Sequence, residues 1–304
     1  MINFAIRHVK IVVLFACLAA SMSGIIVRLA GEMPPIAIGF YRLSFAMPVF
    51  IFFSLAFHRE EFKKLSKRQL GGSVLAGVFL FLHFLTYFTG VGMTTIASAM
   101  VIACLHPVII LIIMALFFKE KTNFKVVTGV VIALVGAAIV SGGDYAIAGE
   151  ALMGDLLCFI TAIAMSLYFI VGQKLGGGIN TTVYVTIVFG CCWVCFGLGM
   201  LVSGTSFTGY ERESYLWVLV LAIVCQIIAH GLFNWTLRYI SPLYLATSET
   251  AEVIYASILA FLLLQEVPVP MQYIGGSLTI AGILIYNYFE AQSAAEAAIA
   301  ADKP

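Results

Sequence analysis

The sequence has very little charge. Only 10% of its 304 residues are Asp, Glu, Lys or Arg, whereas a soluble domain usually carries about 25%. The formal net charge is +1, so the basic surface typical of a nucleic-acid-binding protein is missing and no nucleic-acid partner is expected. In contrast, 62% of the residues are hydrophobic and the mean hydropathy is +1.07. This composition excludes a soluble core and indicates an integral membrane protein.

The short motifs of common catalytic and metal sites are also missing. The chain has no P-loop, HExxH, GxSxG or aspartate-rich cluster, so we expect no enzyme activity, no cofactor and no direct use of ATP. The seven cysteines fall in apolar segments; Cys191, Cys192 and Cys195 lie beside Trp193 and Phe196. Free cysteines in such surroundings usually pack as small apolar side chains, so we expect no metal site there.

What the chain does have is a series of long apolar segments. A helix of roughly 20 residues crosses a bilayer, and ten segments approach that length. They are Val9–Ala30, Pro35–Phe57, Leu70–Gly90, Thr95–Phe118, Val126–Ser141, Leu156–Leu175, Thr181–Ser203, Tyr215–Tyr239, Pro242–Gln265 and Met271–Phe289. The pattern predicts an all-α integral membrane protein with ten transmembrane helices.

The positions of lysine and arginine predict the orientation. With a cytoplasmic N-terminus, 13 of the 16 basic residues fall on the inner side, Arg28 and Arg212 fall outside, and Arg42 lies within the second span. Basic residues prefer cytoplasmic loops. We therefore expect a multi-pass protein of the cell (inner, cytoplasmic) membrane with both termini in the cytoplasm.

The two halves of the chain repeat each other. LFFKEKTNFKVVTGVVIALVGAAIV from Leu116 aligns without gaps with LLLQEVPVPMQYIGGSLTIAGILIY from Leu262, an offset of 146 residues. The predicted units are 1–145, 152–290 and a cytoplasmic tail at 291–304. Five spans is an odd number, so the second unit enters the membrane inverted. Inverted repeats are typical of transporters whose substrate site lies near the midplane.

Four segments carry a resemblance to a known family. They are PPIAIGFYRL (Pro34–Leu43), HPVIILIIMALFFKE (His106–Glu120), GDLLCFITAIAMSLY (Gly154–Tyr168) and EVIYASILAFLLLQE (Glu252–Glu266). In this order they resemble the ten-helix EamA-type branch of the drug/metabolite transporter superfamily, over nearly the whole chain. The resemblance implies two EamA-like five-helix repeats and a transport activity.

The chain departs from the family's pattern at one position. The family usually has proline after the glutamate of the ninth helix, where this chain has Val253; the first repeat keeps Pro107 after His106. Proline inside a helix removes one backbone hydrogen bond and permits a bend. We therefore expect a kink in the fourth helix near His106 and a straighter ninth helix.

Two carboxylates in the ninth helix are the leading site candidates. Glu249 and Glu252 are three residues apart, so they share one face of a continuous helix. At 1.5 Å per residue from Pro242 they lie about 10 and about 15 Å deep. Intramembrane acids usually face the bundle interior or a cavity. They are expected to bind a substrate ammonium or cation or to couple protons; the structural alternative is a buried ion pair.

Histidines, aromatic residues and hydroxyls extend this set. His106 occupies the repeat position of Glu252, so an imidazole and a carboxylate are expected to approach the same axis. Gln226, His230 and Asn234 follow at four-residue steps with Trp235 beside them, and His83 precedes Tyr87 by the same step. Membrane histidines are more commonly satisfied core residues, which is the alternative here. The expected substrate-binding residues are Glu252, Glu249, His106, His83, Tyr87, Asn234, His230, Trp235, Tyr168 and Ser23.

The remaining charged residues are expected to have structural roles. Arg42 is about 10 Å deep and is interpreted as a snorkelling or loop-capping residue, with attraction of a substrate carboxylate as the alternative. Asp155 is expected to cap the start of the sixth helix. Glu120 and Glu266 end their helices at the level of the water and are expected to pair with neighbouring loops.

These features predict a secondary transporter. It would export a small metabolite, such as an amino acid or a related amphipathic solute, by alternating access, either facilitated or proton-coupled. The alternatives are an uncoupled channel or facilitator and, much less favoured, a membrane enzyme using His106 and Glu252, for which no nucleophile is indicated. The expected partners are a small-molecule substrate and the lipid bilayer. Both a monomer and a homodimer are compatible with the sequence.

Overall fold

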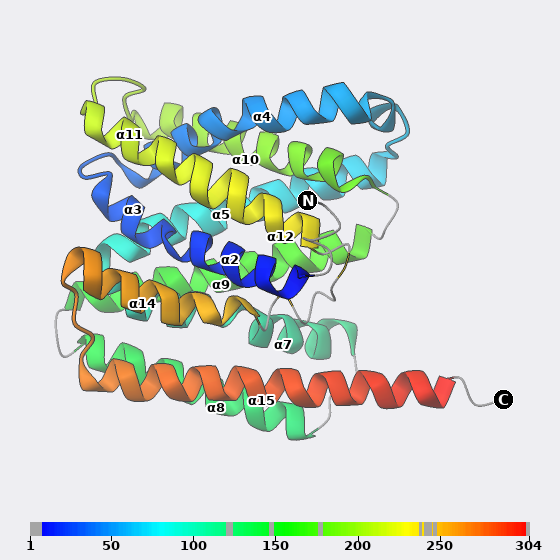
Figure 1. The fold of residues 1–304 in the computed structure, drawn as a ribbon, viewed down its shortest axis with the longest axis vertical. Coiled ribbons are helices and arrows are strands. Elements are labelled where there is room, and N and C mark those ends of the chain that lie inside the picture. Colours follow the sequence, from blue (N-terminus) through cyan, green and yellow to red (C-terminus); the bar gives the residue numbers. More distant parts are fainter. Residues whose placement is uncertain are drawn as a thin grey trace.

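The protein is all-helical over the residues that its computed structural model describes, with no strand among them (Figure 1). These are residues 8–119, 124–145, 149–175, 179–236, 239, 245 and 248–301, without the side chains at 144, 145, 234, 290 and 293–301. The elements are α2 (Val9–Ser21), α3 (Ser23–Leu29), α4 (Pro35–Lys63), α5 (Lys67–Met93), α6 (Ile96–Ala103), α7 (His106–Phe118), α8 (Phe124–Tyr145), α9 (Gly149–Leu175), α10 (Thr181–Ser203), α11 (Arg212–Leu221), the π-helix η1 (Ala222–His230), α12 (Gly231–Thr236), α14 (Ala251–Leu264) and α15 (Pro270–Ala301).

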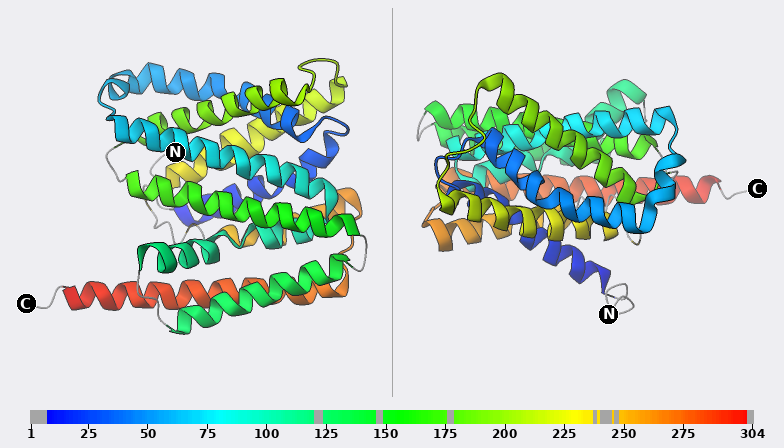
Figure 2. Two further views of the ribbon diagram at one scale, coloured as in Figure 1. Left: turned by 180° about the vertical axis from the view of Figure 1, so that it is seen from behind. Right: turned by 90° about the horizontal axis from the view of Figure 1, so that it is seen from above.

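Within the described part of the chain, eight helical stretches are long and apolar enough to cross a membrane. They are Val9–Leu29, Pro35–Lys63, Lys67–Met93, Ile96–Phe118, Phe124–Gly143, Gly149–Leu175, Thr181–Ser203 and Arg212–Phe233, and they coincide with the first eight predicted spans. The predicted ninth span contains the shorter apolar helix α14, and the predicted tenth lies within α15. Figures 1 and 2 place α8 and α15 side by side at one end of the molecule, with α4 at the other.

Several helices are interrupted in the interior of the bundle. A turn at Met22 separates α2 from α3, and Cys104 and Leu105 separate α6 from α7. Pro107 lies in the first turn of α7, where its missing N–H costs no helical hydrogen bond. The predicted kink near His106 is therefore confirmed.

The prediction of a straighter ninth helix was wrong. The helix is interrupted by a turn at Thr250, which is the repeat position of Cys104, although no proline follows Glu252. Backbone carbonyls released at a break within a membrane need new donors. The thiols of Cys17 and Cys104 provide them, at 3.4 Å from the Ser248 oxygen and 4.0 Å from the Glu249 oxygen. The break therefore depends on tertiary contacts.

The sixth span also begins earlier than predicted. Because α9 starts at Gly149, Asp155 lies in its second turn and does not cap its start as expected. Asp155 is buried, and its Oδ1 accepts a hydrogen bond of 2.9 Å from the Thr94 hydroxyl. This carboxylate therefore joins α9 to the end of α5.

The contacts between α8 and α15 are reciprocal. A Cβ added at Gly129 would lie 2.7 Å from the Gly282 oxygen, and one added at Gly275 would lie 2.6 Å from the Gly136 oxygen. The 146-residue offset relates Gly129 to Gly275 and Gly136 to Gly282, so it converts one contact into the other. A twofold axis produces this exchange of partners. Small residues allow the backbones to approach this closely.

The ends of two helices repeat the same local geometry. Lys119 and Gln265 are 146 residues apart and have φ values of 55° and 56°. Their amides donate to Met114 and Ala260, which are related by the same offset. Left-handed backbone is uncommon for residues other than glycine, so its recurrence at equivalent positions supports the duplication.

Replacing Gly282 by alanine tests the α8–α15 contact. The new Cβ would lie 2.4 Å from the Ala133 amide nitrogen, so we expect a loss of about 1–3 kcal/mol in the free energy of unfolding from overpacking. Thermal or denaturant unfolding in detergent measures it. Gly142→Ala is the matched control in α8, because its new methyl group would have no neighbouring atom within 4 Å. Equal stability of both variants contradicts the contact.

Candidate functional site

The interrupted helices meet around a small central cavity. Its volume is about 90 Å³, and its walls come from α2 to α7, α9, η1, α12, α14 and the turns beside them. Its polar and titratable lining residues are Ser23, Arg42, His83, Tyr87, Cys104, His106, Cys225, His230, Glu249 and Glu252. A cavity of this kind, apolar with a few convergent polar groups, is the usual form of a small-molecule site.

The cavity brings most of the candidate residues together. Seven of the ten line it, namely Glu252, Glu249, His106, His83, Tyr87, His230 and Ser23. Tyr168 and Trp235 are not on its wall; their rings pack against Phe169 and Tyr239 at 5.3 and 4.9 Å. The side chain of Asn234 lies outside the described residues.

Glu249 and His106 form a buried pair across the cavity wall. The Glu249 Oε2 lies 3.0 Å from the His106 Nε2, and each side chain is 7% exposed. The other ring nitrogen faces the Ala103 oxygen at 3.3 Å. Both ring nitrogens therefore lie near oxygen atoms, which hold the imidazole between α6 and the ninth helix. The pair joins the break in the fourth helix to the break in the ninth.

Glu252 has different surroundings. The turn at Thr250 separates it from Glu249, so the two carboxylates do not share one continuous helical face as expected. Glu252 lies in the first turn of α14, where the helix dipole favours a negative charge. Among the described residues, its carboxylate has no hydrogen-bond or ion-pair partner. Glu252 lines the cavity together with Glu249.

Arg42 provides a fixed cation on the cavity wall. It is 1% exposed, so it does not snorkel to the surface as expected. Its Nε donates to the Gln226 Oε1 at 2.8 Å, and its guanidinium lies 4.3 Å from the centre of the Phe84 ring. Gln226 belongs to the π-helix η1, a rare geometry that is frequent at functional sites. A buried arginine in a membrane span is costly unless it has a partner, and this cost is the sequence feature that indicates a contact such as the one with Gln226.

The other two histidines are held in place by their neighbours. The His83 Nδ1 lies 3.2 Å from the Thr161 oxygen, and the ring stacks on Tyr87. The His230 ring has Phe84 and Phe233 edge-to-face, with centroids at 5.9 and 6.2 Å. These contacts fix imidazole groups at the cavity wall without neutralising either carboxylate.

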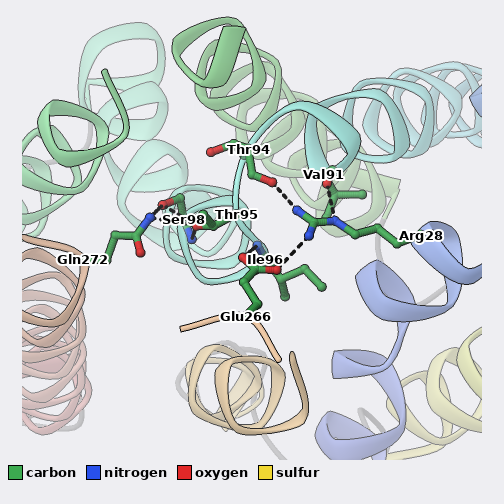
Figure 3. A network of polar contacts seen from close by, with 8 residues as sticks. All are labelled: Arg28, Val91, Thr94, Thr95, Ile96, Ser98, Glu266 and Gln272. Atoms are coloured by element: carbon green, nitrogen blue, oxygen red, sulfur yellow. Dashed lines mark hydrogen bonds and ion pairs between the residues drawn. The ribbon is translucent and has the colours of Figure 1, made fainter. Parts of the chain in front are cut away.

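A second polar cluster lies at one end of the bundle (Figure 3). The Arg28 Nη1 pairs with the Glu266 Oε2 at 2.7 Å, and the other carboxylate oxygen accepts from the Ile96 amide at 2.7 Å. Arg28 also donates to the Val91 oxygen at 2.9 Å and to the Thr94 oxygen. The expected ion pairing of Glu266 is confirmed, whereas Glu120 lies outside the described residues.

The family is identified by a match in both halves of the chain. The model of the EamA-like transporter family matches residues 9–142 and 152–288. The chain belongs to the EamA-like transporter family. This confirms the predicted membership of the drug/metabolite transporter superfamily. It also favours a membrane transporter and gives no support to the enzyme alternative.

Several uncharacterized transporters resemble parts of the chain. The uncharacterized transporter YxxF of Bacillus subtilis is 25% identical over 63% of this chain and 61% of its own length. An uncharacterized transporter of Archaeoglobus fulgidus is 24% identical over 84% of this chain and 88% of its own length. Another from the same organism is matched over only 48% of its length.

The EamA-like fold also has a solved counterpart. A crystal structure aligns with 93% of this chain and 97% of its own, with a TM-score of 0.63 and 20% identity. At this identity the likeness concerns the fold alone. It supports the arrangement of helices that surrounds the cavity.

A double-mutant cycle tests the Glu249–His106 pair. His106→Leu leaves a buried carboxylate without its partner, so we expect the free energy of unfolding to fall by about 3–5 kcal/mol. The double variant His106→Leu/Glu249→Leu removes both charges and should recover most of this loss. Glu252→Gln is the control, because it breaks no described side-chain contact and should change stability less. Additive losses measured by unfolding in detergent contradict the pairing.

Proposed function

We propose that this protein is a secondary transporter that exports a small metabolite, such as an amino acid or a related amphipathic solute, across the cytoplasmic membrane. The observation that carries the proposal is the Glu252 carboxylate, which faces a central cavity and has no described partner. A buried charge without a partner is costly in a membrane. Its retention is understandable if a transported cation or proton supplies the missing partner during the cycle.

The proposed architecture is ten transmembrane helices in two inverted five-helix repeats, 1–145 and 152–290, with residues 291–304 as a cytoplasmic tail. The reciprocal glycine contacts of α8 and α15 support the twofold axis. The repeated helix ends at Lys119 and Gln265 support the 146-residue register. The distribution of basic residues supports cytoplasmic termini. Rocking of the two repeats about the central site would then give alternating access.

The charges of the cavity suit a zwitterionic substrate. Arg42 offers a guanidinium to a substrate carboxylate, and Glu252 offers a carboxylate to a substrate ammonium, while Phe84 and Phe233 provide apolar surface. Glu249 is already engaged by His106, so Glu252 is the acid that remains for the substrate. This division favours a small amphipathic solute over a simple anion or a neutral lipid.

The size of the cavity favours a carrier over an open pore. About 90 Å³ is the space of roughly three waters at about 30 Å³ each, and well below the roughly 300–1,000 Å³ of typical ligand pockets. A substrate therefore requires the walls to separate. The helix breaks at Met22, Cys104 and Thr250 border the cavity and provide places where this movement can occur.

Proton coupling follows from competition for Glu252. A proton on this carboxylate removes the charge that holds a substrate ammonium, so binding of one excludes the other. Entry of a proton from outside would release the substrate there, and loss of the proton inside would prepare the next binding step. This scheme is an antiport that needs no ATP and uses one acidic residue.

Glu252→Gln tests the proposed coupling. We expect flux driven by a pH gradient to fall at least about tenfold, as for the loss of an interaction of about 1.4 kcal/mol or more. A metabolite comparison of overexpressing and null cells first identifies candidate amino acids. Flux of these amino acids is then measured in proteoliposomes loaded with them. Glu60→Gln, on the exposed part of α4, is the control. Wild-type driven flux through Glu252→Gln would falsify the coupling role.

Counterflow separates the carrier from the channel alternative. A carrier exchanges labelled substrate faster when unlabelled substrate is present on the opposite side, because its binding site then crosses back with substrate bound and not empty. A pore gives unsaturable flux without this stimulation. Stimulated exchange in wild-type protein is the expected result.

A further inference from the structure

We propose that Arg28 and Glu266 form the gate that closes the outer end of the transport pathway, an inference that rests on the proposed function for its orientation. The two side chains form the ion pair at the centre of the cluster in Figure 3. Four helices that line the cavity, α3, α5, α6 and α14, all end or begin at this cluster or beside it.

The position of the cluster relative to the cavity supports a gate. Arg28 follows the cavity residue Ser23 by five residues on α3, which is about 7.5 Å along a helix. Val91 follows Tyr87 by one turn on α5, and Ile96 precedes Met100 by one turn on α6. The cluster therefore lies just beyond the cavity, on the side that the basic-residue distribution assigns to the outside.

The bonding of the cluster is suited to holding separate helices together. Arg28 donates to the carbonyls of Val91 and Thr94, near the end of α5, where helical carbonyls need donors. Glu266 accepts from the amide of Ile96 at the start of α6, where helical amides need acceptors. Arg28 belongs to α3, and Glu266 follows α14. Their ion pair thus links these two helices to the end of α5 and to the start of α6. Its side chains are 28% and 14% exposed, so the pair is partly shielded from water.

The repeat supplies a position equivalent to Arg28 at the opposite end of the bundle. The 146-residue offset places Lys174 at the repeat position of Arg28. The Lys174 Nζ lies 3.3 Å from the centre of the Phe118 ring, so this lysine has different surroundings from Arg28. Lys174 is therefore a matched control at the opposite end of the bundle.

Chemical labelling of the cavity tests the gate without requiring a known substrate. Cys104 lines the cavity and is 6% exposed. A membrane-impermeant methanethiosulfonate, added outside right-side-out vesicles, should label Cys104 slowly in the wild type. Glu266→Gln should raise the rate at least about fivefold, the lower range of coupling effects in two-state proteins. Arg28→Lys keeps a positive charge but cannot reproduce the forked contacts, so a smaller rise is expected.

Mass spectrometry of the peptide that contains Cys104 gives the rate for this thiol alone. Lys174→Gln should leave the outer labelling rate at the wild-type value. The proposal is overturned if both gate variants label at the wild-type rate, or if Lys174→Gln raises the outer rate equally. Arg28→Lys provides the answer if Glu266→Gln does not fold. Because no transport is measured, a negative result here is separate from a failure of Glu252→Gln in the flux assay.

Discussion

The pairing of Glu249 with His106 is the constraint on which the centre of this protein depends. A carboxylate buried in the membrane without a partner is costly, and His106 gives one of the two acids a partner at 3.0 Å. Both residues lie beside helix breaks that are repeat-related. The pair therefore links the fourth helix to the ninth beside the cavity, which Glu252 also lines.

The two repeat-related breaks have different causes. In the fourth helix, Pro107 makes the interruption compatible with the local sequence. In the ninth helix no proline follows Glu252, and thiols of Cys17 and Cys104 contact the backbone oxygens of Ser248 and Glu249. The same geometric feature thus has a local cause in one repeat and a tertiary cause in the other.

This difference explains what could be predicted from the sequence. Hydrophobic length predicted the first eight spans and Pro107 predicted the kink at His106, because both signals are local. The break at Thr250 and the position of Asp155 depend on contacts with residues far along the chain. The 146-residue offset relates His106 to Glu252. In the structure, however, the imidazole of His106 contacts Glu249, which the turn at Thr250 separates from Glu252.

Positions that are 146 residues apart carry different residue types, and this difference has a consequence for transport. A perfectly symmetric protein would present identical chemistry at both ends and at equivalent positions of the central site. Here His106 stands where the other repeat has Glu252, and Arg28 stands where it has Lys174. In the proposed arrangement of inverted repeats, substitutions at equivalent positions make the free energies of the two conformations differ. Under the proposed coupling, the gradient sets the direction of transport, and these substitutions set which of the two ends of the pathway is closed in the state with a small cavity.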